Sequence, residues 1–209
     1  MMTIRISRWA MTVAVLILAG AVALPAWGQD ATQQLVDDLR QQIQSSATMD
    51  DKTKAFAEEA LLPMITDGTL VSAVEEQNAA GTSLDEIKRI DAEWSEAEEP
   101  LDVMMEKMGN PCAERLTALS RDYPAIVEAF AMDNQGAVVG ENNLTSDYWQ
   151  GDEAKWQDSY NGGQGGLAVG EVEFDRSANA SLQQISLPII ADGGRVVGAI
   201  TFGVAVSNL

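Results

Sequence analysis

The chain has 209 residues, of which 32 are acidic and 13 are basic, so its formal net charge at pH 7 is −19. This charge argues against nucleic acids and anionic membranes as partners, because both attract basic patches. The sequence has no histidine, which excludes Ser-His and Cys-His catalysis, histidine-based metal sites and histidine pH switches. Its single cysteine, Cys112, excludes an intramolecular disulfide. We expect no cofactor and no metal site.

Residues 1–28 have the pattern of a secretory signal peptide. Two arginines precede an uninterrupted apolar stretch at residues 11–23, and small residues then stand at the two key positions before a cleavage site between Gly28 and Gln29. A retained membrane anchor is the less favoured alternative, because the apolar run stops at Pro25 and is short for a membrane span. We therefore expect a periplasmic or secreted protein.

An acidic helical segment is predicted for residues 29–84. Apolar residues at helical spacing run from Leu35 to Ile43, and a second apolar stripe covers residues 70–74. Gly81 is placed to end that second helix in the left-handed conformation. Helices are thus expected to precede the strands along the chain.

A further helix is expected to begin at Ser83, which forms a capping box with Glu86. The apolar stripe at residues 87–94 continues this helix until Pro100 interrupts it. Residues 110–111, Asn-Pro, fit the N-cap and first position of the next helix.

The break between these helices carries glutamates within residues 96–99. They indicate either a cation site or a solvated face, and we favour the solvated face. The methionines that follow, Met104, Met105 and Met108, are expected to fill a seam between helices.

The C-terminal part has the alternation and turns of strands. Five strands are predicted, at residues 126–132, 137–139, 167–174, 182–190 and 196–206. The turn at residues 133–136 makes the first two a β-hairpin. A short helix at residues 151–159 and a glycine loop at 162–166 separate them from the last three. The predicted class is α+β, with N-terminal helices followed by a five-stranded antiparallel sheet.

The connecting segment at residues 146–156, SDYWQGDEAKW, gathers aromatic and polar side chains between two predicted strands. Rings bury apolar ligand surface and attract cations, while polar groups orient a ligand. The alternative is that Trp149 and Trp156 anchor a loop to the core. Both interpretations remain open from this segment alone.

Four stretches of the chain together resemble the Cache or PDC sensor family, the extracytoplasmic relatives of PAS domains. They are AFAMDNQGAVVGE at 129–141, TSDYWQGDEAKW at 145–156, GEVEFD at 170–175 and SLPIIADGGRVVGAITFGVAV at 186–206. The resemblance covers residues 85–209. It implies a PAS-like five-stranded antiparallel sheet with a ligand pocket between one sheet face and the connecting segment.

The resemblance also implies that Asp147, Tyr148, Trp149 and Trp156 line the pocket and that Glu171 or Glu173 faces it. A cation would suit this site best, with Asp147 or Asp152 pairing its charge, and Lys155 is the candidate partner of a ligand carboxylate. Asp147 is equally well explained as a turn or capping residue, and Tyr148 as a core ring. Glu171 and Glu173 share one strand face, but they face solvent if Val172 and Phe174 on the other face are core residues. Lys155 is the only basic residue in the segment, and it lacks the bidentate fork of an arginine.

The resemblance implies a periplasmic small-ligand-binding sensory module for an amine, an amino acid or a small carboxylate. Such a module would pass its state to a partner, a membrane receptor or a kinase. The alternative is an acidic helical interaction or scaffold protein without a small ligand, docking on a basic partner or forming a homodimer through its N-terminal helices. An enzyme using carboxylate pairs is not favoured, because the acidic composition supplies such pairs by chance.

Overall fold

The computed structural model describes residues 26–175 and 180–209, so the predicted signal peptide lies almost entirely outside the described residues. In chain order the helices are α1 (Ala26–Ser45), α2 (Asp51–Phe56), α3 (Gly68–Ala80), α4 (Leu84–Glu96), α5 (Asp102–Gly109), α6 (Pro111–Asp122) and α7 (Ala154–Tyr160). The strands are β1 (Ile126–Met132), β2 (Val138–Glu141), β3 (Ala168–Asp175), β4 (Ala180–Ala191) and β5 (Arg195–Ala205). The predicted α+β class is confirmed. Across these ranges no helix is both long enough and apolar enough to cross a membrane.

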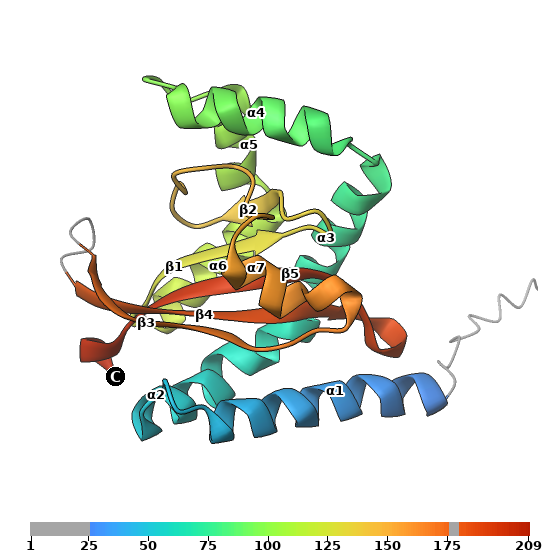
Figure 1. The fold of residues 1–209 in the computed structure, drawn as a ribbon, viewed down its shortest axis with the longest axis vertical. Coiled ribbons are helices and arrows are strands. Elements are labelled where there is room, and N and C mark those ends of the chain that lie inside the picture. The colour runs from blue at the N-terminus through green and yellow to red at the C-terminus, as the bar shows by residue number, and fades with distance from the viewer. Residues whose placement is uncertain (1–25, 176–179) are drawn as a thin grey trace, which may run out of the picture.

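The five strands form one antiparallel sheet in the order β2-β1-β5-β4-β3. The last strand in the sequence therefore lies in the middle of the sheet, and β2 and β3 form its edges (Figure 1). On β1, Phe130 stands between Glu141 of β2 and Thr201 of β5. This is the PAS-like sheet that the motif resemblance implies.

Among the described residues, two clusters of buried apolar side chains lie between the helices and the sheet, and a third lies beneath α7. The larger, which we call the main core, joins α1, residues 57–66, α3 and α6 to one sheet face, and Leu39, Leu116 and Phe202 are fully buried in it. The smaller, the second core, consists of Ile87, Trp94, Met104, Ala137, Val138 and Tyr148. Figure 1 shows α1 and α4 at opposite ends of the molecule.

The other sheet face is covered by α7. Because side chains alternate along a strand, Ala131 joins the main core while its neighbours Phe130 and Met132 point away from it. Trp156 and Tyr160 pack against these two side chains. In Figure 1, α7 lies in front of β4 and β5.

The predicted helix ends are largely confirmed. Gly81 ends α3 with φ of 65°, and Asn110 caps α6 by accepting a hydrogen bond from the Ala113 N–H at 2.9 Å. Ser83 caps α4 through the Glu86 N–H. The capping box is only half formed, because the Glu86 carboxylate pairs with the Arg89 guanidinium.

Two predictions about buried apolar residues were wrong. Met104 is buried, but Met105 is 61% exposed and Met108 is also exposed, because one face of α5 points to solvent. Val172 and Phe174 are 49% and 63% exposed. All of residues 171–174 are exposed, so neither face of this stretch of the edge strand β3 is covered.

Candidate functional site

The connecting segment after β2 returns to pair with the β1–β2 hairpin. The Val138 N–H donates to the Tyr148 carbonyl at 3.0 Å, and the Gln150 N–H donates to the Gly136 carbonyl at 2.8 Å. On its other side, Asp91 of α4 accepts the backbone N–H groups of both Tyr148 and Trp149 through Oδ1, at 2.9 and 2.8 Å. One carboxylate therefore fixes the segment to α4.

Tyr148 is the most deeply buried aromatic residue of the segment. Its side chain is only 5% exposed, and its ring lies 5.5 Å from that of Trp94 in the second core. Burial, together with the nearby charges of Asp133 and Glu106, raises the pKa of the phenol well above its ordinary value. Within the part of the chain that the structure describes, its hydroxyl makes no hydrogen bond. It is therefore a protonated donor without an acceptor.

Trp149 is half-buried between α4 and the hairpin. Its indole N–H donates to the Gln135 carbonyl at 2.8 Å, and the Lys88 ammonium lies 4.3 Å from the ring centre. The predicted cation–π contact of this ring is thus made by a side chain of the protein itself.

The two predicted aspartates of the segment have different surroundings. Asp147 organises its own turn, because its Oδ1 accepts from the Gln150 side-chain amide at 2.6 Å and from the Ser146 hydroxyl at 3.0 Å. This is the turn role that the sequence left open for it. Asp152 is exposed.

Lys155 and Trp156 belong to α7 and lie over the sheet, away from Tyr148. The Lys155 ammonium pairs with Glu153 at 3.0 Å and lies 5.3 Å from the Phe130 ring centre. Trp156 stacks on Tyr160 at 5.1 Å and donates its indole N–H to the Asp133 carbonyl at 3.0 Å. Both side chains anchor α7 to the sheet.

Glu171 lies on the exposed edge strand β3, in a groove that also contains Glu128 and Glu173. This groove shares no lining residue with the cavity beside Tyr148. Of the predicted residues only Tyr148 lines that cavity, while Lys155 and Trp156 lie in the α7 layer and Glu171 at the β3 edge.

A cavity of about 550 Å³ opens beside Tyr148. It is bounded by α3, α5, the start of α6 and β2, and its lining consists of Thr69, Ser72, Ala73, Glu76, Gln77, Ala80, Thr82, Glu106, Lys107, Asn110, Pro111, Val139 and Tyr148. Its volume falls within the range of small-molecule sites, about 300–1,000 Å³. Apolar groups and a few fixed polar groups share the wall, as ligand sites require.

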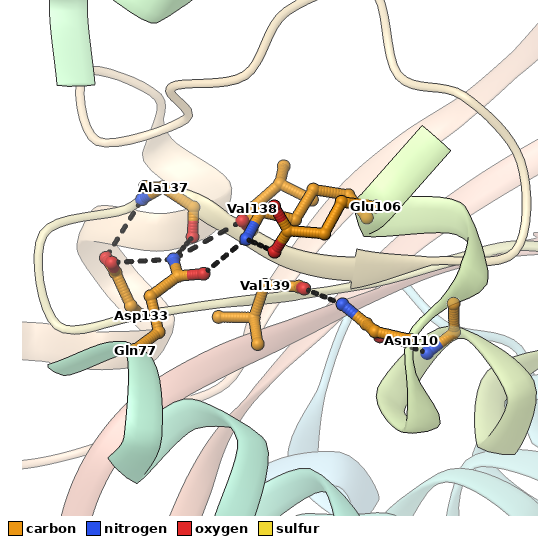
Figure 2. Close-up of polar contacts among 9 residues, drawn as sticks. Gln77, Glu106, Asn110, Asp133, Ala137, Val138 and Val139 are labelled. Carbon is orange, nitrogen blue, oxygen red and sulfur yellow. Dashed lines mark hydrogen bonds and ion pairs between the residues drawn. The ribbon is translucent and has the colours of Figure 1, made fainter. Parts of the chain in front are cut away.

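The polar floor of this cavity is built around Gln77 of α3. Its amide nitrogen donates to Asp133 Oδ2 at 2.9 Å, and its amide oxygen accepts from Lys107 Nζ at 3.0 Å. Asp133 is itself held by the N–H groups of Gln135 and Ala137, at 2.8 and 3.0 Å. Figure 2 shows Gln77 between the hairpin turn at Asp133 and the strand at Val138. The network fixes α3, α5 and the hairpin relative to one another.

Lys107 is only 8% exposed, although it is charged. Its ammonium donates to Gln77 Oε1 and to Glu106 Oε1, both at 3.0 Å. Asn110, at the start of α6, donates to the Val139 carbonyl at 2.7 Å (Figure 2). Together these contacts place an ammonium and a helix N-terminus on the same cavity wall.

Sequence reasoning missed Lys107, Glu106 and Gln77. A signal for Lys107 was present, because it follows the buried Met104 by three positions and so shares its helix face. A lysine on the apolar face of a helix needs a partner. The partner Gln77 could not be found from sequence, because it is 30 residues away along the chain.

A second buried polar group lies where the segment leaves the sheet. Glu141, at the end of β2, is fully buried, and its Oε2 accepts the Thr145 N–H at 3.0 Å. Burial, reinforced by the charge of Glu128, raises the pKa of Glu141 to about 7. Its Oε1 has no partner within residues 26–175 and 180–209. Among these residues no cluster of side chains fits a metal ion.

No protein-family model matches the chain, and no curated protein matches it. Several solved structures match the chain at low sequence identity. One is the sensor domain of the V. cholerae histidine kinase DctB, with 15% identity, a TM-score of 0.44, and coverage of 84% of this chain and 58% of that one. Another is the ligand-binding domain of the Campylobacter jejuni chemoreceptor Tlp3 in complex with 4-methylisoleucine. It has 14% identity, a TM-score of 0.41, and coverage of 88% and 62%.

The same Tlp3 sensory domain with isoleucine bound matches at 11% identity and a TM-score of 0.35, over 88% of this chain and 64% of that one. The chain thus spans less than two thirds of each of these three crystallised chains. All three solved structures are sensory or ligand-binding domains.

Proposed function

We propose that this chain is an extracytoplasmic sensory module of the Cache/PDC type that binds a small ligand beside Tyr148. The ligand is an amine, an amino acid or a small carboxylate, and the bound state is read by a partner, a membrane receptor or a kinase. The observation that supports this proposal is the cavity of about 550 Å³, which has the hydroxyl of Tyr148 and the buried ammonium of Lys107 in its wall.

The position of Tyr148 supports a sensory rather than a merely storage role. Tyr148 lines the cavity and also belongs to the second core, where it contacts Trp94 of α4. A ligand that moves the Tyr148 ring therefore acts on α4 through a packed contact. α4 carries Glu86, Arg89 and Glu93 on its exposed side, where a partner protein can read its position.

The test is a thermal-unfolding screen of the protein against amino acids, amines and small carboxylates. A ligand at 100 times its dissociation constant adds about 2.7 kcal/mol to the free energy of unfolding. We expect a clear shift with at least one ligand, retained in Trp156→Phe and lost in Tyr148→Ala. No shift with any ligand would instead favour an acidic scaffold that docks on a basic partner.

A further inference from the structure

We infer that Lys107, Tyr148 and the N-terminus of α6 form an oxyanion site for the carboxylate of a small ligand, and that Glu106 occupies this site in the ligand-free protein. The inference rests on the proposed function, because it uses the same cavity. It goes further by naming the part of the ligand that is bound and the side chain that must be displaced.

The first step is the hydrogen-bonding capacity of Lys107. An ammonium carries three N–H donors and no acceptor. Two of the three are used, by Gln77 Oε1 and Glu106 Oε1. The Gln77 contact is fixed, since the same amide is tied to Asp133. The ammonium therefore has one donor left, and a second donor is held by an exchangeable partner.

Glu106 is that exchangeable partner. Its side chain is 65% exposed, whereas the Lys107 side chain is 10% exposed. The exposed Glu106 carboxylate regains contact with water when it leaves Lys107, whereas the buried ammonium then needs another anion in its place. Glu106 thus shows that a carboxylate can reach the buried ammonium from the cavity side, and a ligand carboxylate can replace it at low cost.

Tyr148 supplies a second donor to the same cavity. Its side chain lines this cavity together with Lys107 and Glu106. Because the hydroxyl stays protonated and has no partner in the described chain, it is available to donate to an anion.

The helix α6 adds a favourable field. Its N-cap Asn110 and first residue Pro111 both line the cavity. The N-terminus of a helix carries a partial positive charge that favours anions. Beside the helix N-terminus and Lys107 an anion is favoured over a cation, whereas a cation is favoured only beside Glu76 and Glu106 of the same cavity.

The remaining wall indicates the rest of the ligand. Ala73, Ala80 and Val139 supply apolar surface in the same cavity. A carboxylate with a short apolar body can contact both the polar donors and the apolar surface of the cavity, whereas an inorganic anion can contact only the donors. Amino acids and simple carboxylic acids share this chemistry.

Isothermal titration of the protein with a series of carboxylates tests the inference. Each carboxylate is compared with its primary amide and with the amine of the same carbon skeleton, and the series includes α-amino acids and inorganic phosphate. We expect at least one carboxylate to bind and its amide and amine to bind about tenfold or more weakly, the value of a charge-assisted hydrogen bond. Comparing α-amino acids with carboxylic acids that lack an amino group shows which of these two ligand classes the site binds.

Three variants separate this site from general electrostatics. Lys107→Met should weaken carboxylate binding about tenfold or more, and Tyr148→Phe, which keeps the ring, about threefold to tenfold. Glu106→Gln should strengthen binding, since it weakens the internal competitor. Glu76→Gln removes one negative charge from the same cavity without touching Lys107, so it should strengthen binding less.

The failures of the two proposals are distinguishable. If an amine or an amide binds as well as the carboxylate does, the cavity binds ligands but the oxyanion site is wrong. Equal effects of Glu106→Gln and Glu76→Gln would also overturn the displacement of Glu106. If phosphate binds and no carboxylate does, the assignment of the site to a ligand carboxylate is wrong. If no compound of the series binds, both the proposed function and the oxyanion site are wrong.

Discussion

The main core and the second core are held by different kinds of contact. In the main core, strands and helices bury aliphatic and aromatic side chains such as Ile200 and Phe202 against one another. The second core is small, and its attachment depends on polar contacts, chiefly Asp91 to the segment backbone and the Trp94 indole N–H to the Thr145 carbonyl at 2.9 Å.

This difference predicts that the second core opens more easily than the main core. Regions with few buried apolar contacts open with lower free energy than the rest of a protein. The cavity lies where the two cores meet, because Val139 belongs to the main core and Tyr148 to the second. A ligand there contacts a rigid wall on one side and a more easily displaced wall on the other.

The largest effect should come from the main core. Phe202→Ala removes a fully buried ring and should lower the free energy of unfolding by about 3–5 kcal/mol. Chemical denaturation measures this loss. Amide hydrogen exchange should then accelerate across the sheet and α1 together. Faster exchange confined to α4 would contradict the assignment of Phe202 to a main core that opens separately from the second core.

Glu141 tests the junction between sheet and segment. Its pKa is raised to about 7 from an ordinary 4.5, so its contribution to stability is full below pH 4.5 and is lost as pH rises to about 7. The loss should reach about 3 kcal/mol over that window. Glu141→Gln should lack this part of the pH dependence when both proteins are unfolded in denaturant at several pH values. Parallel pH profiles would contradict the prediction.

Asp91 tests the attachment of the second core. Asp91→Ala removes the acceptor of two backbone N–H groups and should lower the free energy of unfolding by about 2 kcal/mol. Amide exchange should rise in α4 and in residues 145–149 while the sheet remains protected. Asp91→Asn keeps an acceptor oxygen and should cost less, which separates the hydrogen bonds from the helix surface itself. Uniform acceleration across the protein would mean that the two cores unfold together.

The smallest effect is expected at the sheet edge. Phe174→Ser should change the free energy of unfolding by less than about 0.5 kcal/mol, because the ring is 63% exposed. It is the matched contrast to Phe202, which has the same side chain in a strand of the same sheet. A loss of several kcal/mol on denaturation would show that the ring is covered in solution.

Local chemistry made parts of the fold predictable. Gly81 and Asn110 act within one turn of their own helices, so their capping roles follow from nearest neighbours. The β-hairpin at residues 133–136 is likewise local. Within the helical segment predicted for residues 29–84, the sequence marks no separate helix at residues 51–66, since this stretch combines an α turn, a π turn and a 3₁₀ turn whose side chains give no single period.

The sequence by itself determined the order of helices and strands, the acidic surface and the aromatic segment that contains Tyr148, because these depend on composition and on spacing along the chain. Only the tertiary structure decided the strand order, the exposure of Phe174 and the meeting of Lys107 with Gln77. These features depend on which distant residues become neighbours, and burial and hydrogen bonding are set by such neighbours rather than by local pattern.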